Sequence, residues 1–219
     1  MKKRGLWILI LLSTVFAVGI AVNLLWKPDP IKLLQHGLEE LYDATSFRYT
    51  MVQHQNVEGE NRLYYQISGE QDNNTRRIFG EVVGTQVEMV FTPETLYMQD
   101  PFTKRWVHYP TTPESHQVFL AELDPITSLQ FKELGEVLLQ GTERIKQGSS
   151  WVVQFQPTVQ NQLMEDGWTD FKYMMFIGKS NKLIHRVIIE AKSKTNSQLM
   201  SMTLEFEDYG EKIDISLPN

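Results

Sequence analysis

The pattern of apolar and polar positions divides the chain into three parts. An apolar run fills most of the first 26 residues, residues 31–41 repeat apolar positions every three or four residues, and from residue 46 apolar and polar positions alternate. A period near 3.6 is typical of an amphipathic helix, and a period of two is typical of a half-buried strand. We therefore expect an apolar N-terminal segment, one helix and a mainly β domain.

The N-terminal segment has the features of a membrane anchor. Gly5–Trp26 lacks charged side chains, and Lys2, Lys3 and Arg4 precede it. A helix of this length spans roughly 33 Å at about 1.5 Å per residue, enough for a bilayer core of about 30 Å. Bases before the span favour a cytoplasmic N-terminus. We predict a cytoplasmic tail at 1–4, a single-pass transmembrane anchor at 5–26, a spacer at 27–29 and an extracytoplasmic domain at 30–219.

A cleaved signal peptide is the alternative interpretation of this segment. Gly19 and Ala21 would stand at the −3 and −1 positions of a cut before Val22. The apolar run continues to Trp26, however, and exceeds the roughly 7–15 apolar residues of a signal peptide. The length favours an uncleaved anchor in the cell membrane, and both interpretations place residues 27–219 outside the cytoplasm.

The exported part begins with the helix. Asp29 can cap it, Pro30 suits its first position, and Ile31, Leu34, Leu38 and Leu41 share one face. Short alternating segments separated by turn residues follow, which indicates an antiparallel meander because parallel strands need long crossovers. The predicted strands are Phe47–Met51, Leu63–Ile67, Ile78–Val82, Val87–Phe91, Leu96–Met98, Arg105–Tyr109, Thr142–Gln147, Trp151–Gln156, Phe171–Ile177, Leu183–Ala191, Leu199–Phe206 and Ile213–Leu217.

Residues 112–140 interrupt the meander. Apolar residues cluster on both sides of Asp124-Pro125, which predicts two short amphipathic helices. A sheet of about ten or eleven strands must curl, and its apolar face then becomes concave. The predicted fold class is mainly β with α, a curled antiparallel sheet or open half-barrel covered on its concave face by the first helix and this helical insert.

Apolar surface that these helices leave uncovered would form a hydrophobic cavity. Met residues suit such a lining because they adapt to varied apolar shapes. We expect the cavity walls to be Phe47, Tyr49, Met51, Leu63, Tyr65, Val87, Met89, Phe91, Phe119, Leu123, Trp151, Val153, Phe155, Tyr173 and Met175. A fully packed core is the alternative, and a cavity above about 300 Å³ would favour the ligand-binding interpretation.

Composition excludes several kinds of chemistry. The chain has 21 Lys and Arg against 27 Asp and Glu, a net charge of −6, which argues against nucleic-acid binding. It has no Cys, so disulfides, thiolate metal sites and lipidation at an N-terminal Cys are excluded. Catalytic and phosphate-binding motifs are absent, and the five His stand apart in the sequence. We expect no enzymatic activity, no metal and no cofactor.

Two stretches carry a resemblance to a known fold family. Leu96-Tyr97-Met98-Gln99-Asp100 followed by Arg105-Trp106-Val107, and Ile184–Glu190 followed by Leu204–Tyr209 and Ile213–Pro218, resemble patterns of the LolA-like lipoprotein carriers, which include LppX- and LprG-like lipoproteins. The resemblance covers roughly residues 30–218. It implies that acyl chains or lipidated partners bind the concave face beneath a helical lid. Unlike the lipoprotein members, this chain lacks the lipidated Cys.

Together these observations predict a membrane-anchored extracytoplasmic module that binds a lipid, an acyl chain or a lipoprotein. The alternative is a regulatory or structural protein-interaction domain of the cell envelope, with a filled core and an envelope protein as its partner.

Overall fold

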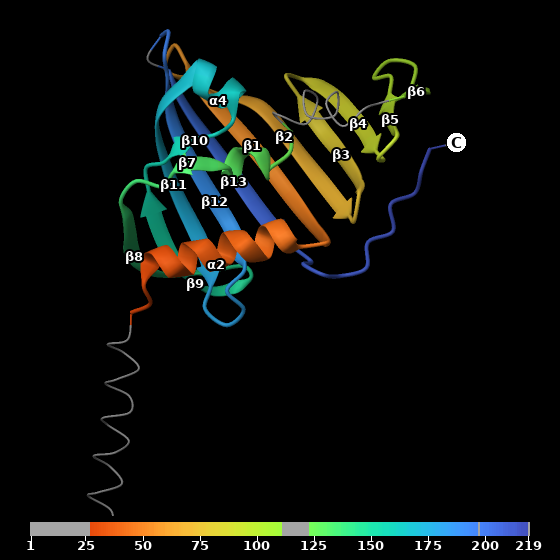
Figure 1. The fold of residues 1–219 in the computed structure, drawn as a ribbon. Coiled ribbons are helices and arrows are strands. Elements are labelled where there is room, and N and C mark those ends of the chain that lie inside the picture. The colour runs from red at the N-terminus through yellow and green to blue at the C-terminus, as the bar shows by residue number, and fades with distance from the viewer. Residues whose placement is uncertain (1–26, 111–122, 197, 219) are drawn as a thin grey trace, which may run out of the picture.

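An antiparallel sheet of eleven strands dominates the structure, a computed structural model that describes residues 27–110, 123–196 and 198–218 (Figure 1). The strand order is β6-β5-β4-β3-β2-β1-β13-β12-β11-β9-β8, so β6 and β8 are the edges and the sheet is not closed. The strands are β1 (Ser46–Val57), β2 (Glu60–Asp72), β3 (Thr75–Val82), β4 (Thr85–Phe91), β5 (Thr95–Gln99), β6 (Trp106–Pro110), β8 (Val137–Ile145), β9 (Gly148–Phe155), β11 (Trp168–Gly178), β12 (Ile184–Ser193) and β13 (Leu199–Glu207).

The remaining elements lie on the concave side of this curled sheet (Figure 1). They are helix α2 (Pro30–Asp43), the 3₁₀ turn η1 (Thr127–Leu129), the small sheet of β7 (Phe131–Glu133) and β10 (Thr158–Val159), and helix α4 (Gln162–Gly167). The fold is therefore mainly β, with two helices in the described part of the chain.

Helix α2 follows the sequence prediction closely. The Asp29 carboxylate accepts hydrogen bonds from the backbone N–H groups of Ile31 (3.0 Å) and Lys32 (3.4 Å), and Pro30 opens the helix. Leu34, Leu38 and Leu41 are buried as predicted, whereas Ile31 is 48% exposed. The helix packs on β8, β11 and β12.

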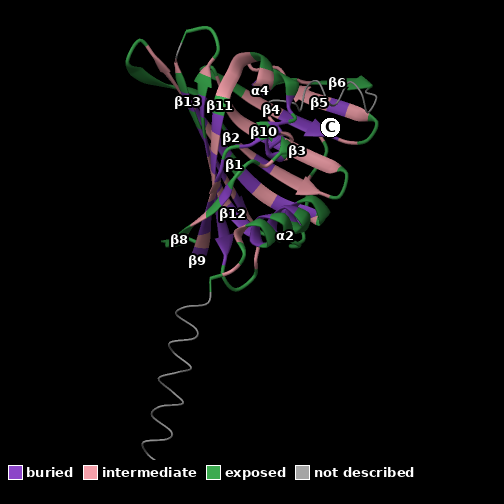
Figure 2. Cartoon of the chain, turned by 60° about the vertical axis from the view of Figure 1, so that its left-hand side comes forward, coloured by how far each residue is buried: buried purple, intermediate pink, exposed green. Residues whose placement is uncertain are grey.

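The core lies between the sheet and the elements that cover it. Figure 2 shows that the buried positions run along the strands of the sheet and helix α2. Near the centre of the core Phe131, Phe155 and Tyr173 pack with ring centroids 5.1–5.4 Å apart. Ion pairs instead link neighbouring strands on the opposite face, for example Arg48–Glu70 at 2.9 Å. The alternation of apolar and polar positions therefore corresponds to one dry face and one wet face.

The predicted helical insert at 112–140 is wrong in its described part. Residues 123–140 contain one 3₁₀ turn, the strand β7 and the start of β8, and no α-helix. Hydrogen bonds compete with the helix here, because the Gln130 carbonyl accepts from the Gln160 N–H (2.9 Å) and β7 pairs with β10. Residues 111–122, with Phe119, lie outside the described residues.

Two further predictions differ from the structure. The expected strand at Ile213–Leu217 is absent, because the chain turns at Asp208–Gly210 and makes isolated bonds to Ser46, such as Ser46 Oγ to the Glu211 carbonyl (2.8 Å). Helix α4 was not predicted. Within the described ranges no helix is long and apolar enough to cross a membrane; the predicted anchor, Gly5–Trp26, lies outside them.

Candidate functional site

One chain segment, residues 123–134, crosses the concave side and is hereafter the crossing segment. Three tyrosines from different elements donate their hydroxyl groups to its backbone. Tyr49 of β1 bonds the Leu123 carbonyl (3.0 Å), Tyr173 of β11 bonds the Ser128 carbonyl (2.8 Å), and Tyr42 of α2 bonds the Leu129 carbonyl. These bonds hold the segment at a fixed height above the sheet.

The position of Tyr49 depends on its neighbour across the strand pair. Gly69 faces Tyr49 in the register of β1 and β2, and a Cβ at Gly69 would lie 2.1 Å from the Tyr49 ring. The absence of a side chain at Gly69 therefore lets the ring cross the β2 backbone towards the crossing segment. An ion pair between Arg76 of β3 and the buried Asp124 fixes the same end of that segment.

The tyrosine hydroxyl groups are neutral donors. Burial raises the pKa of Tyr49 well above its ordinary value, with a smaller contribution from the nearby Asp124 carboxylate. Burial also raises the pKa of Tyr173 and brings the pKa of Tyr42 to about 12. The three protons therefore stay in place at neutral pH, and the bonds to the crossing segment persist.

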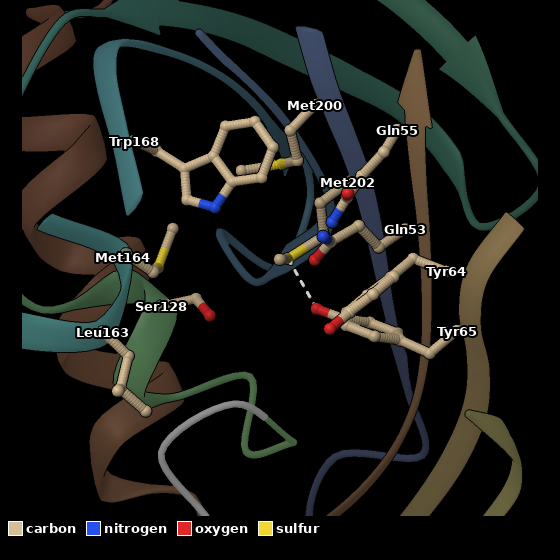
Figure 3. Close-up of a pocket in the computed structure, with 10 residues that line it drawn as sticks. All are labelled: Gln53, Gln55, Tyr64, Tyr65, Ser128, Leu163, Met164, Trp168, Met200 and Met202. Carbon is tan, nitrogen blue, oxygen red and sulfur yellow. Dashed lines mark hydrogen bonds between the residues drawn. The ribbon is translucent and has the colours of Figure 1, made fainter. Parts of the chain in front are cut away.

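Beyond the crossing segment, a cavity of about 220 Å³ lies between α4 and the strands β1, β2 and β13 (Figure 3). Its walls come from five parts of the chain and combine three Met, three aromatic side chains, one Leu and three small or amide side chains. The lining residues are Gln53, Gln55, Tyr64, Tyr65, Ser128, Leu163, Met164, Trp168, Met200 and Met202. None of these described lining residues carries a charge.

The local fold explains how these side chains meet. Asn161 caps α4 by accepting the Met164 N–H (3.1 Å), which turns Met164 inward while Leu163 stays 48% exposed. On the opposite wall the Tyr65 hydroxyl contacts the Met202 sulfur (3.8 Å; Figure 3). The cavity therefore has a buried thioether floor and an open side near Leu163 and Tyr64.

Most of the predicted wall residues lie in the packed core. Phe47, Tyr49, Met51, Met89, Phe91, Val153, Phe155, Tyr173 and Met175 are buried there, and Leu123 and Trp151 pack partly buried against them. Of the fourteen predicted residues that the structure describes, Tyr65 alone is among the residues that line the cavity. Whether the others contact a ligand stays a prediction.

Leu63 is the most exposed of the described set, and Val87 is half-buried outside the packed core. Leu63 is 41% exposed, because the register shifts there: Tyr65 pairs with Gln53 but Leu63 pairs with His54, so Tyr64 is an extra residue. This bulge turns Tyr64 towards the cavity beside Tyr65. A prediction based on strict alternation of apolar and polar positions cannot place this extra residue.

Several lining residues were not predicted, although the period-two pattern of the sequence includes them. Gln53 and Gln55 continue the period of Phe47, Tyr49 and Met51, but an apolar criterion excludes them. Met200 and Met202 alternate on β13 in the same way. Met164 and Trp168 depend on α4, whose position is set by tertiary contacts.

A larger groove of about 610 Å³ lies near the ends of β1, β11, β12 and β13. Its lining includes Asp170, Lys172, Glu190 and Lys192, which form ion pairs at 3.5 Å (Lys172–Glu190) and 3.2 Å (Lys192–Asp170). Burying these charges under an apolar chain would be costly. We therefore take the smaller, uncharged cavity as the candidate site.

Groups suited to metal binding do not cluster in the described part of the chain. The most enclosed of the described histidines, His185, lies 3.2 Å from the Asn181 amide and packs edge-on against Tyr209. Burial lowers the pKa of His185. Its contacts are those of a structural residue at the β11–β12 turn.

No protein-family model matches the sequence, and no characterised protein matches it in sequence. The structure is similar to the lipoprotein LppX from Mycobacterium tuberculosis, with a TM-score of 0.60 and 12% identity over 86% of this chain and 100% of LppX. It is also similar to LprF from Mycobacterium bovis, with a TM-score of 0.57 and 15% identity over 89% of this chain and 99% of LprF.

A LolA superfamily protein from Nitrosomonas europaea matches more distantly, with a TM-score of 0.34 and 9% identity over 88% of this chain and 96% of the other. Identities this low describe a shared fold alone. The resemblance to LppX-like lipoproteins inferred from the sequence is confirmed at that level: the chain has the fold of LppX and LprF.

Proposed function

We propose that this chain is a membrane-anchored extracytoplasmic module that binds a lipid, an acyl chain or the acyl group of a lipoprotein. The observation that carries the proposal is an uncharged, Met-rich cavity on the concave side of a LolA-like sheet. Met side chains accommodate apolar chains of varied shape. Burying a methylene contributes about 0.8 kcal/mol, so micromolar binding, at about 8.2 kcal/mol, needs a chain of about ten buried methylenes.

The cavity volume limits the size of this ligand. About 220 Å³ lies below the roughly 300–1,000 Å³ of clefts that enclose drug-sized ligands. By the criterion taken from the sequence, this volume does not favour ligand binding over a packed core, so the proposal rests on the lining of the cavity and not on its size. The space suits part of one acyl chain.

Leu163 offers a test that separates binding from stability. Leu163→Trp adds bulk at the open side of the cavity, where the residue is 48% exposed. Leu138→Trp is the matched control, because Leu138 is 43% exposed on β8 and does not line the cavity. Titration of residues 27–219 with a fluorescent fatty acyl probe should show weaker binding for Leu163→Trp only. Equal binding by both variants would argue against the site.

A protein-interaction domain is the second candidate, because most of the concave face is filled by packed side chains such as Phe47, Met51 and Phe155. Under that proposal an acyl probe would not bind at all, and the chain would instead be recovered with an envelope protein.

The anchor is part of the proposal and rests on the uncharged span Gly5–Trp26 behind three bases. N-terminal sequencing of the membrane-fraction protein tests it, and a chain that starts at Val22 would contradict it. Protease added to spheroplasts should digest the domain, and protection from that protease would contradict the proposed orientation.

A further inference from the structure

Two polar side chains of the cavity make no side-chain hydrogen bond to a described residue. Gln53 is 6% exposed and Ser128 is 2% exposed, and both point into the cavity from opposite sides (Figure 3). The Ser128 carbonyl accepts from Tyr173, but neither the Ser128 hydroxyl nor the Gln53 amide bonds to any described residue.

The polar atoms of these two side chains remain accessible from the cavity. The described side-chain atoms that are closed to water and have no partner are instead Gln147 Oε1, Ser150 Oγ and His185 Nδ1. The two groups differ from Tyr49 and Tyr173, whose buried hydroxyls donate to carbonyls of the crossing segment. Gln53 and Ser128 therefore have bonding capacity directed at the space between them.

The charge of the lining restricts what can occupy that space. Among the described lining residues there is no Lys, Arg, His, Asp or Glu. A carboxylate or phosphate would lose its hydration without gaining a counter-charge, whereas a carbonyl oxygen needs only one or two hydrogen-bond donors. A glutamine amide and a serine hydroxyl supply such donors.

We propose that the cavity selects an uncharged acyl ester over a free fatty acid, with the ester carbonyl accepting hydrogen bonds from the Gln53 amide and the Ser128 hydroxyl. This inference rests on the proposed acyl-binding function and names the class of ligand. The chain of the ester packs on Met164, Met200 and Met202, and the remainder of the molecule leaves by the open side near Leu163.

Three ligands with the same eight-carbon chain separate the contributions. Monooctanoylglycerol has an ester carbonyl and is uncharged. The ether 1-O-octylglycerol has no carbonyl and is also uncharged, and octanoate has a carboxylate that is ionised at pH 7. Their affinities are measured by tryptophan fluorescence on the full chain held in amphipol. We expect monooctanoylglycerol to bind roughly tenfold more tightly than the ether, the size expected for one or two net hydrogen bonds, and octanoate to bind more weakly still.

Variants assign this preference to the two side chains. Gln53→Leu and Ser128→Ala should each reduce the ester-to-ether ratio towards one while leaving the affinity for the ether nearly unchanged. Gln66→Leu and Ser68→Ala are matched controls on β2, outside the cavity lining, and should keep the ratio. If Gln53→Leu leaves the ester-to-ether ratio of affinities unchanged, Gln53 does not have the proposed role.

The outcomes distinguish a failure of this inference from a failure of the proposed acyl-binding function. Equal affinity for ester and ether, or tighter binding of octanoate, would overturn the inference and leave acyl binding intact. Failure of all three ligands to bind would overturn the proposed function itself.

Discussion

Removal of single tyrosine hydroxyls should reveal how firmly the crossing segment is fixed to the sheet. Tyr173→Phe deletes the donor to the Ser128 carbonyl, and both residues are buried, at 0% and 2% exposure. A buried acceptor left unpaired costs about 1–3 kcal/mol, and a typical net hydrogen bond contributes about 1 kcal/mol. We expect a loss of about 1–2 kcal/mol in the free energy of unfolding.

For a chain of 219 residues each kcal/mol corresponds to about 2–4 °C in Tm, so the expected fall is about 2–8 °C. Tyr42→Phe is the matched control. Leu129 is fully buried, but Tyr42 itself is 45% exposed, so its removal opens a path by which water can partly replace the hydroxyl, and the loss should be smaller than for Tyr173→Phe.

Urea denaturation of residues 27–219 measures both free energies, and hydrogen exchange of the amides in residues 123–134 shows whether the segment has loosened. The reasoning is refuted if Tyr42→Phe costs as much as Tyr173→Phe, or if Tyr173→Phe leaves both stability and exchange unchanged.

Three further predictions concern the packing and the pH response. Met89→Trp should destabilise by about 1–3 kcal/mol in a melting experiment, because Met89 is buried and does not line the cavity; an unchanged Tm would mean that open space exists there. Gly69→Ala should displace the Tyr49 ring and accelerate hydrogen exchange of residues 123–134, and unchanged exchange would contradict the contact. Burial lowers the pKa of His185, so as the pH falls the imidazole is protonated in the unfolded chain before it is protonated in the folded one. The free energy of unfolding should therefore decrease as the pH falls below about 6.5, the ordinary pKa of histidine. The decrease should be smaller in His185→Gln.

The sequence was sufficient wherever the determining interactions are local. The Asp29 cap and Pro30 define the start of α2. Alternation predicts a strand at each position of the large sheet, but β8 starts at Val137, five residues before the predicted strand Thr142–Gln147. The same period of two predicts that one face of the sheet is apolar. These features require only the pattern of neighbouring residues.

The errors occur where distant residues decide the outcome. The crossing segment has a helical apolar pattern, but its backbone bonds to tyrosines of α2, β1 and β11 and to Gln160. The Tyr64 bulge depends on the register of β1, and α4 brings Met164 and Trp168 to the cavity through tertiary packing. The site was therefore assigned to aromatic core positions, whereas its cavity is lined by Met, Gln and Tyr.

Native mass spectrometry of residues 27–219, purified without added lipid or detergent, tests acyl binding most directly. We predict a bound species whose mass corresponds to an acylated molecule and which is lost or much reduced in Leu163→Trp but retained in Leu138→Trp. A wild-type chain that is recovered only at its own mass, and that takes up no acyl ligand when one is added, would contradict the account.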